Sequence, residues 1–247
     1  MPTTFFAVTS ALSNKSDLVC VERRGQGYTG NQILRRCETR RQILADAGVR
    51  YKTSLLILVH DNLLAFETTL AAWALGACVA LVDFKCPPSR LQEYVDIIKP
   101  ELLIFGKGAG PNSSVKVLHL PFDLDYADQT LRAGHDLKPE DTALYITSSG
   151  TTAAPKAESR SHASYCDYIH NTQNSGVYKM LTTGSFVSPS SLAFSASMGA
   201  WVIHLCSGRS IIALELMHSL AELDSALKRP DVESTAMAPS VLRRLLA

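Results

Sequence analysis

The sequence has almost no excess of charge of either sign, with 24 lysine and arginine residues against 23 aspartate and glutamate residues in a chain of 247. No long basic run breaks this balance. Nucleic acids and anionic membranes are usually bound by clustered positive charge, so the composition argues against both as partners. A small anion held in one pocket is fully compatible with it.

Long apolar segments are also lacking. The longest apolar run, from Leu70 to Val82, is shorter than the roughly 20 residues that a membrane-spanning helix needs. The N-terminus, MPTTFFAVTSALSNK, has neither a basic lead nor a sustained apolar stretch, so it does not resemble a signal peptide. We therefore expect a cytoplasmic protein that does not bind membranes.

The cysteines do not have the spacing of a metal or redox site. None forms a C-x-x-C pair, and none lies at metal-ligand spacing with a histidine. Several stand in apolar runs, where a free cysteine behaves as a small hydrophobe. We expect reduced structural thiols and no metal bound by cysteine and histidine. The six are Cys20, Cys37, Cys78, Cys86, Cys166 and Cys206.

Hydrophobic residues make up 46% of the chain. Short apolar runs typical of strands alternate along it with segments of helical spacing. Strands are predicted over 17–22, 55–59, 79–82, 102–105, 115–118 and 143–147, and helices over 30–47, 63–75 and 90–98. Thr29 and Asp61 are the expected N-caps of the first two helices, and Gly48 and Gly76 their ends. This rhythm predicts an α/β fold with a parallel sheet. The polar stretch 123–139 is predicted to be an irregular surface connection and a candidate subdomain boundary.

One loop concentrates groups that can bind phosphate. Residues 145–157 read YITSSGTTAAPKA and follow directly on the last predicted strand. A glycine lets the backbone N–H approach a ligand closely, and a lysine adds a positive charge. The residues expected to contact phosphate are Ser148, Ser149, Gly150, Thr151, Thr152 and Lys156. A Ser/Thr-rich surface turn would have a similar composition, and the Walker A pattern G-x-x-x-x-G-K-[ST] is absent.

The loop resembles the phosphate loop of the acyl-adenylate-forming superfamily. This superfamily includes acyl- and aryl-CoA ligases, luciferases and the adenylation domains of nonribosomal peptide synthetases. Its pattern is T-S-G-[ST]-T-G-x-P-K-G, which the segment from Ser148 to Thr152, followed by Pro155 and Lys156, matches in order. His162 falls where the family has the histidine of a downstream T-H or E-H pair, and we expect it to have a structural role.

Four further segments resemble elements of the same family, in the same order. They are Gly27-Tyr28-Thr29 with Leu34, the stretch AWALGACVALVDFKCPPSRL from Ala72 to Leu91, the stretch FSASMGAWVIHLCSG from Phe194 to Gly208, and Ala238-Pro239-Ser240 with Leu242. These matches cover nearly the whole chain. The alternative hypothesis, an unrelated α/β protein whose loop matches by chance, would have to account for all of these ordered matches.

The resemblance implies both a fold and a reaction. The fold would be that of the N-terminal subdomains of the adenylate-forming enzymes, with layered parallel and mixed sheets flanked by helices. In the reaction, a carboxylic acid and ATP, with Mg²⁺, would form an acyl-adenylate. The thiol of CoA, or of the phosphopantetheine on a carrier protein, would then accept the acyl group.

The acyl pocket departs from the amino-acid-activating members of the family. By position, the resemblance assigns this pocket to Phe194, Ser195, Ala196 and Gly199, although a helix face packed with small residues would have the same pattern. Amino-acid-activating members have an aspartate for the substrate's α-ammonium group where this chain has Ser195. A hydroxyl does not neutralise a buried ammonium group, and an unpaired buried charge is costly. We therefore expect an aryl, keto, hydroxy or fatty acid rather than an ordinary α-amino acid.

Two other departures leave the activity open. Ala153 and Ala157 replace glycines of the family's loop, and alanine at a position of positive φ would cost roughly 1–2 kcal/mol. The chain also ends at Ala247, short of the family's usual length, so residues 1–247 are expected to form a partial AMP-binding domain without the C-terminal lid domain. It could be the N-terminal part of an acid-activating enzyme whose remaining portion is a partner. It could also be a degenerate or truncated non-catalytic member that binds nucleotide or another protein.

Overall fold

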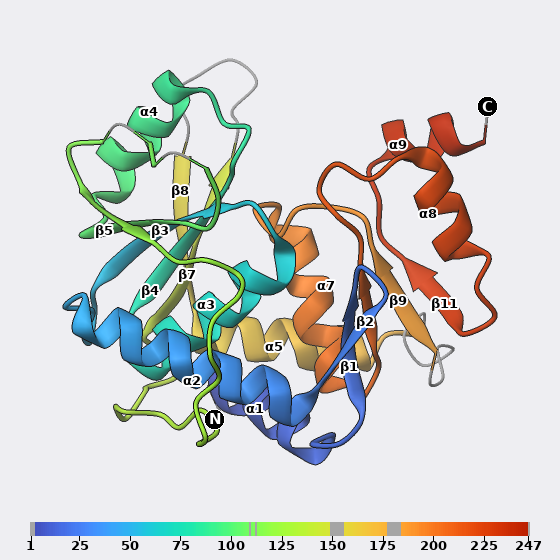
Figure 1. The fold of residues 1–247 in the computed structure, drawn as a ribbon, viewed down its shortest axis with the longest axis horizontal. Coiled ribbons are helices and arrows are strands. Elements are labelled where there is room, and N and C mark those ends of the chain that lie inside the picture. Colours follow the sequence, from blue (N-terminus) through green and yellow to red (C-terminus); the bar gives the residue numbers. More distant parts are fainter. Residues whose placement is uncertain (1–2, 109, 112, 149–155, 177–183, 247) are drawn as a thin grey trace.

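The computed structural model describes residues 3–108, 110–111, 113–148, 156–176 and 184–246. The described strands form two sheets, and helices lie between and around them (Figure 1). Only two neighbouring strand pairs are antiparallel, and the other pairs in the described sheets are parallel. The predicted α/β class with layered parallel and mixed sheets is confirmed.

The larger sheet has six strands in the order β6-β5-β3-β4-β7-β8. They are β3 (Ser54–Val59), β4 (Cys78–Asp83), β5 (Leu102–Phe105), β6 (Lys116–His119), β7 (Thr142–Ser148) and β8 (Lys156–Ser161). The last pair, β7 and β8, is antiparallel. All four strands that the sequence predicted between residues 55 and 118, and the one at 143–147, lie in this sheet. The apolar runs of β3, β4 and β5 suit strands that are buried on both faces, whereas the edge strand β6 is partly exposed.

The smaller sheet has five strands in the order β11-β9-β10-β1-β2. They are β1 (Val19–Arg23), β2 (Gln26–Thr29), β9 (Ser185–Ser188), β10 (Ile211–Ala213) and β11 (Val232–Thr235). The hairpin β1–β2 from the start of the chain pairs in parallel with β10 from its last fifth. The sequence predicted only the first of these strands, because the others have only three or four residues each.

Eight helices lie in the part of the chain that the structure describes. They are α1 (Thr4–Asn14), α2 (Gly30–Asp46), α3 (Asn62–Ala74), α4 (Pro88–Ile98), α5 (His162–Gln173), α7 (Ser195–Cys206), α8 (Leu220–Leu227) and α9 (Pro239–Leu245). The three predicted helices correspond to α2, α3 and α4, and the other five were not predicted. Thr29 caps α2 in a capping box with Gln32, and Asp61 caps α3. Gly48 and Gly76, which follow these helices, have φ of +97° and +74°. These are left-handed conformations that glycine adopts at little cost. No helix of the described part of the chain is long and apolar enough to cross a bilayer.

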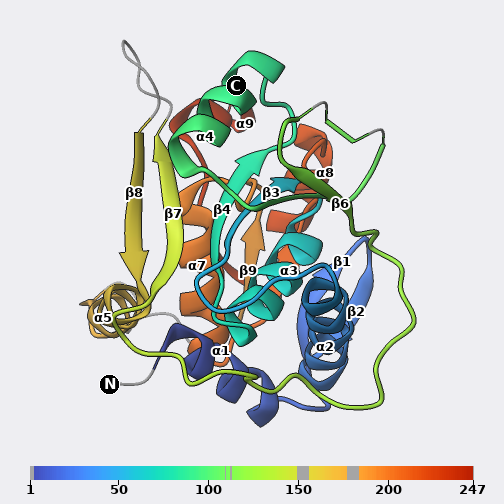
Figure 2. The ribbon, with the colours of Figure 1, turned by 90° about the vertical axis from the view of Figure 1, so that its left-hand side faces the viewer.

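Helix α3 lies at the centre of the molecule, and all 13 of its residues are buried (Figure 2). Its one charged residue, Glu67, is fully buried and accepts hydrogen bonds from Arg36 and Arg40 of α2. Burial lowers the pKa of Arg36, but the Glu67 carboxylate and Tyr126 outweigh this effect, so the pKa is raised overall. The three side chains form an ion cluster inside the protein, which we call the Glu67 cluster.

The Glu67 cluster also fixes the irregular segment that follows β6. Arg40 donates to the carbonyl oxygens of Pro121 and Phe122, each at 3.0 Å, and Arg36 donates to the Tyr126 hydroxyl at 2.8 Å. The stretch 123–139 contains no helix or strand, as predicted, and its start is tied to the interior by buried charge. Its role as a subdomain boundary stays a prediction.

Candidate functional site

The predicted phosphate loop connects the two antiparallel strands β7 and β8. Ser148, at the end of β7, pairs with Lys156, at the start of β8. Ser149, Gly150, Thr151 and Thr152 lie outside the described residues, as does Ala153. The two flanking strands therefore fix where the loop leaves and re-enters the sheet, next to β4.

The described end of this loop suits an anion. Lys156 is exposed, and it forms no ion pair with any part of the chain that the structure describes. The next residue, Ala157, lies opposite Thr147 and packs against the apolar cluster beneath α4. Its backbone is not among the non-glycine residues with positive φ. Alanine therefore fits the extended strand at this position without strain, and a glycine is not required there.

A cavity of about 860 Å³ lies beside the end of β7. Thr147 contributes to its wall from β7, and Ser195 and Ala196 contribute from the first turn of α7. Asp83 at the end of β4 and Lys85 just after it also line this cavity. The sequence-predicted substrate residues Phe194, Ser195 and Ala196 thus share one cavity with the strand that leads into the phosphate loop. This volume is typical of pockets for small molecules.

The start of α7 separates this cavity from a second one of about 610 Å³. Ser195 and Ala196 line both cavities, and both side chains are exposed. The second cavity is also lined by Arg160 from β8 and by Tyr168 from α5. No side chain caps α7, and the Phe194 ring at its N-cap position is 61% exposed. A ligand could therefore reach the first turn of α7 from either side.

Gly199 differs from the other predicted pocket residues. It lies one turn further along α7, is buried, and lines neither of the two cavities. A Cβ atom at this position would lie 2.8 Å from Cε1 of Tyr168. The space that a side chain would take is thus filled by the Tyr168 ring. Sequence reasoning missed Tyr168 because nothing in its local pattern shows that α5 packs against α7.

The sequence also missed Asp83 and Lys85, although a topological signal for them exists. In open α/β sheets, ligands bind beyond the carboxyl ends of the strands. Because β4 and β7 are parallel neighbours, the residues after β4 belong at the same edge as the phosphate loop. The backbone N–H of Lys85 donates to the Asp83 carboxylate at 2.9 Å, which fixes this turn.

His162 is buried at the start of α5, and its ring packs edge-on against Trp73. Burial lowers its pKa from 6.5 to about 4, although the nearby Asp141 carboxylate opposes this shift. Its backbone N–H donates to the Asp141 carbonyl oxygen at 3.0 Å, and its carbonyl oxygen accepts from Thr4. It lines neither cavity, and these contacts agree with the expected structural role.

Comparison with known proteins assigns a family. The profile of the family described as AMP-binding enzyme matches residues 8–247. Tyrocidine synthase 1 of Brevibacillus parabrevis is 22% identical over 237 residues, which are 93% of this chain and 22% of that protein. Cyclochlorotine synthetase of Talaromyces islandicus is 24% identical over 214 residues, 82% of this chain and 4% of that protein. The chain thus spans only a small part of these relatives.

Solved structures agree on the fold. o-Succinylbenzoate CoA synthetase (MenE) of Bacillus subtilis, in complex with the acyl-adenylate intermediate OSB-AMP, has a TM-score of 0.82 at 14% identity, over 97% of this chain and 63% of that one. The N-terminal subdomain of Klebsiella oxytoca NpsA, in complex with 3-hydroxybenzoyl-AMSN, has a TM-score of 0.80 at 16% identity, over 100% of this chain and 62% of that one. With a family match over almost every residue and the corresponding fold, the chain belongs to the AMP-binding enzyme family.

Proposed function

We propose that this chain forms the part of an enzyme that binds a carboxylic acid and ATP and joins them as an acyl-adenylate. One observation supports this most directly: the strand entering the phosphate loop and the first turn of α7 line a single cavity of about 860 Å³. The two substrates must meet for the reaction, so a shared cavity beside both predicted sites is what the chemistry requires.

In the proposed reaction, a carboxylate oxygen attacks the α-phosphorus of ATP and the bond to the pyrophosphate breaks. Lys156 and the loop residues Ser148 to Thr152 would hold the β- and γ-phosphates by charge-assisted hydrogen bonds. When bound, Mg²⁺ would neutralise part of the phosphate charge. In the whole protein, the acyl group would then pass to the thiol of CoA or of a carrier-protein phosphopantetheine. The proposed location of the protein is the cytoplasm.

The acid is proposed to be aryl, keto, hydroxy or fatty, not an ordinary α-amino acid. Ser195 lines both cavities at the start of α7 and offers a hydroxyl group where an ammonium group would need a carboxylate. The ligands named for two structural neighbours, OSB-AMP and 3-hydroxybenzoyl-AMSN, carry aryl acyl groups, whereas the neighbour VinN is named in complex with L-aspartate. The test panel therefore contains both aryl and amino acids.

The test is ATP–pyrophosphate exchange with a panel of aryl, keto, fatty and amino acids, together with ATP binding measured by calorimetry. We expect ATP binding that Lys156→Ala weakens roughly tenfold, the loss of one charge-assisted contact. Lys138→Ala is the matched control, because Lys138 is also an exposed lysine but lies outside the predicted phosphate loop. Exchange that depends on an aryl, keto or fatty acid would establish the activity.

The same experiment separates the alternatives. ATP binding without exchange would indicate a half-site that needs the rest of the protein for turnover. Equal affinity of wild type and Lys156→Ala would contradict the assignment of Lys156 to the phosphates. Exchange that responds only to α-amino acids would contradict the assignment of the acid class, and a lack of both binding and exchange would favour the non-catalytic hypothesis.

A further inference from the structure

The six-stranded sheet contains a topological switch point away from the phosphate loop. From β3 the chain passes through α3 to β4 on one side, and then through α4 to β5 on the other side of β3. Alternate residues of β3 pack with α3 and with α4, so the two helices cover opposite faces. Helices that diverge in this way leave a crevice beyond the carboxyl ends of the two central strands, where open α/β sheets bind ligands.

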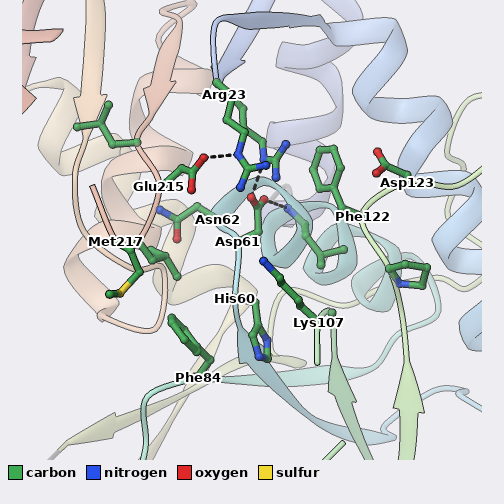
Figure 3. A pocket seen from close by; sticks show the side chains of 16 residues that line it. Arg23, His60, Asp61, Asn62, Phe84, Lys107, Phe122, Asp123, Glu215 and Met217 are labelled. Carbon is green, nitrogen blue, oxygen red and sulfur yellow. Dashed lines mark hydrogen bonds and ion pairs between the residues drawn. The ribbon is translucent and has the colours of Figure 1, made fainter. Parts of the chain in front are cut away.

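A cavity of about 550 Å³ occupies this crevice, and we call it the switch-point cavity (Figure 3). His60 and Asp61 reach it from the end of β3, and Lys107 from the end of β5. The smaller sheet contributes from its own carboxyl edge, with Arg23 at the end of β1 and Met217 after β10. The ends of parallel strands from both sheets therefore converge on one hollow.

Most charged side chains around the switch-point cavity are already paired. Arg23 donates from Nε to Asp61 at 2.5 Å, and Arg24 pairs with Glu215. Asp61 also caps α3, so the start of that helix is occupied by a carboxylate. Lys107 is different: Figure 3 shows its ammonium group directed into the cavity, and no ion pair joins it to a carboxylate in the described ranges.

Aromatic rings line the same cavity. His60 and Phe84 are stacked, with ring centroids 5.0 Å apart and an interplanar angle of 28°. On the opposite side, the Arg23 guanidinium lies 3.7 Å from the centroid of the Phe122 ring. Asp123 also lines the cavity, on the other side of the Phe122 ring from Lys107 in the view of Figure 3, and no ion pair joins it to Lys107. The Lys107 ammonium group could pair with the head of a small anion, and the His60 and Phe84 rings offer apolar surface for a flat ring attached to that head.

We infer that the switch-point cavity is a second binding site, for a small aromatic anion with a carboxylate or phosphate head. The anion pairs with Lys107, and its ring lies against His60 and Phe84. Lys107 and His60 line this cavity and neither of the two cavities at α7, although Leu216 lines both it and the 860 Å³ cavity. The inference uses none of the residues assigned to ATP or to the acid in the proposed adenylation.

The test uses protein labelled with ¹³C at the methionine methyl groups. Met217 lines the switch-point cavity, whereas Met198 lies beside Ser195 at the start of α7, and each signal is assigned from a Met→Leu variant. Benzoate and phenyl phosphate are titrated separately, with benzamide as the neutral analogue. We expect both anions to shift the Met217 signal, the tighter of the two identifying the head group, and benzamide to bind at least roughly tenfold more weakly.

Variants locate the binding site. Lys107→Met is expected to weaken anion binding roughly tenfold and Lys107→Arg to restore it, while Lys138→Met serves as the matched control. Ala196→Trp obstructs the α7 cavities and should leave the Met217 response unchanged. The inference is overturned if Lys107→Met binds benzoate and phenyl phosphate as Lys138→Met does, if benzamide binds equally well, or if only the Met198 signal responds and Ala196→Trp abolishes it.

Discussion

The centre of the molecule and its C-terminal helices use charged and apolar side chains in opposite ways. At the centre, α3 is buried along its whole length, and its one carboxylate, Glu67, is fully buried between two arginines. In α9 no residue is buried, and Leu242 is 44% exposed. Residue type alone therefore does not decide which side chains are inside, since a glutamate lies in the core and a leucine at the surface.

An arginine–glutamate ion pair affects the stability of the protein differently when it is buried and when it is exposed. Arg36 and Arg40 hold Glu67 where none of the three is more than 3% exposed, whereas Arg90 and Glu93 pair on the surface of α4. Exposed pairs contribute about 0–1 kcal/mol, because water screens both charges. Removing one partner of a buried pair costs far more, because it leaves a charge without either water or a counter-ion.

The largest expected effect comes from breaking the Glu67 cluster. Glu67→Gln should lower the free energy of unfolding by about 3–5 kcal/mol, because Arg36 and Arg40 lose their counter-charge in the interior. The matched variant Glu93→Gln, in an exposed pair, should change it by less than about 1 kcal/mol. Urea denaturation of both variants measures the difference. Equal changes in the free energy of unfolding for the two variants would mean that the buried Glu67 cluster contributes no more to stability than an exposed ion pair.

A second variant tests packing beside the same helix. Trp73 of α3 is fully buried and donates from its indole N–H to the carbonyl oxygen of Ala143 in β7, at 2.9 Å. Trp73→Phe should cost about 2–3 kcal/mol, since it leaves unfilled space and removes the donor. The shift of the denaturation midpoint checks this. A change below about 1 kcal/mol would show that the core closes around the smaller ring.

A third prediction concerns pH. Because His162 has a pKa of about 4 when folded and 6.5 as its ordinary value, the unfolded chain binds the extra proton between these limits. Stability is therefore lost as pH falls from about 6.5 towards 4, by about 2 kcal/mol between pH 7.5 and pH 5 for this residue. His162→Leu should show a smaller loss than wild type over this range. His204, whose pKa burial and Arg209 also lower to about 4, titrates in both proteins.

The control for this pH dependence lies in the same helix. His170 is exposed near the end of α5, and His170→Leu should keep the full wild-type loss of stability at low pH. Denaturation curves at several pH values between 7.5 and 4.5 compare the three proteins. A wild-type slope in His162→Leu would show that other groups cause the acid sensitivity.

The smallest expected effect is at the C-terminal helices. Leu242→Ser in α9 should change the free energy of unfolding by no more than about 0.5 kcal/mol, because the leucine is exposed and little apolar surface is lost. Leu223→Ser in α8, whose side chain is fully buried, is the contrasting variant and should cost several times more. If both variants had the same effect, the exposure of α9 would not describe the folded protein in solution.

Local signals in the sequence predicted much of the fold. The helix over 63–75 was found within one residue of α3, because Asp61 caps its start and Gly76 adopts the positive φ that ends it. The strands β3, β4 and β5 were found because uninterrupted apolar runs are typical of buried parallel strands. The short strands β9, β10 and β11 were not found, because three or four residues contain too little pattern to distinguish a strand from a loop.

The predicted site residues all come from contiguous motifs, the phosphate loop and the start of α7. Of the two strands that flank the loop, β7 shares a cavity with the start of α7 through Thr147. The part of the wall after β4 was missed, as was Tyr168, whose ring takes the space at Gly199. These contacts depend on which strands pair and which helices pack together, and local sequence patterns predict neither the pairing nor the packing.

The sequence by itself determined the helices α2 to α4, most strands of the larger sheet and the family, because caps, turns and motifs act over a few residues. Only the tertiary structure decided that β1 pairs with β10, that Glu67 meets two arginines from another helix, and that Lys107 faces a hollow where both sheets end. The physical reason is that burial and charge pairing depend on distances between residues far apart in the chain. Those distances are fixed only when the whole core packs at once.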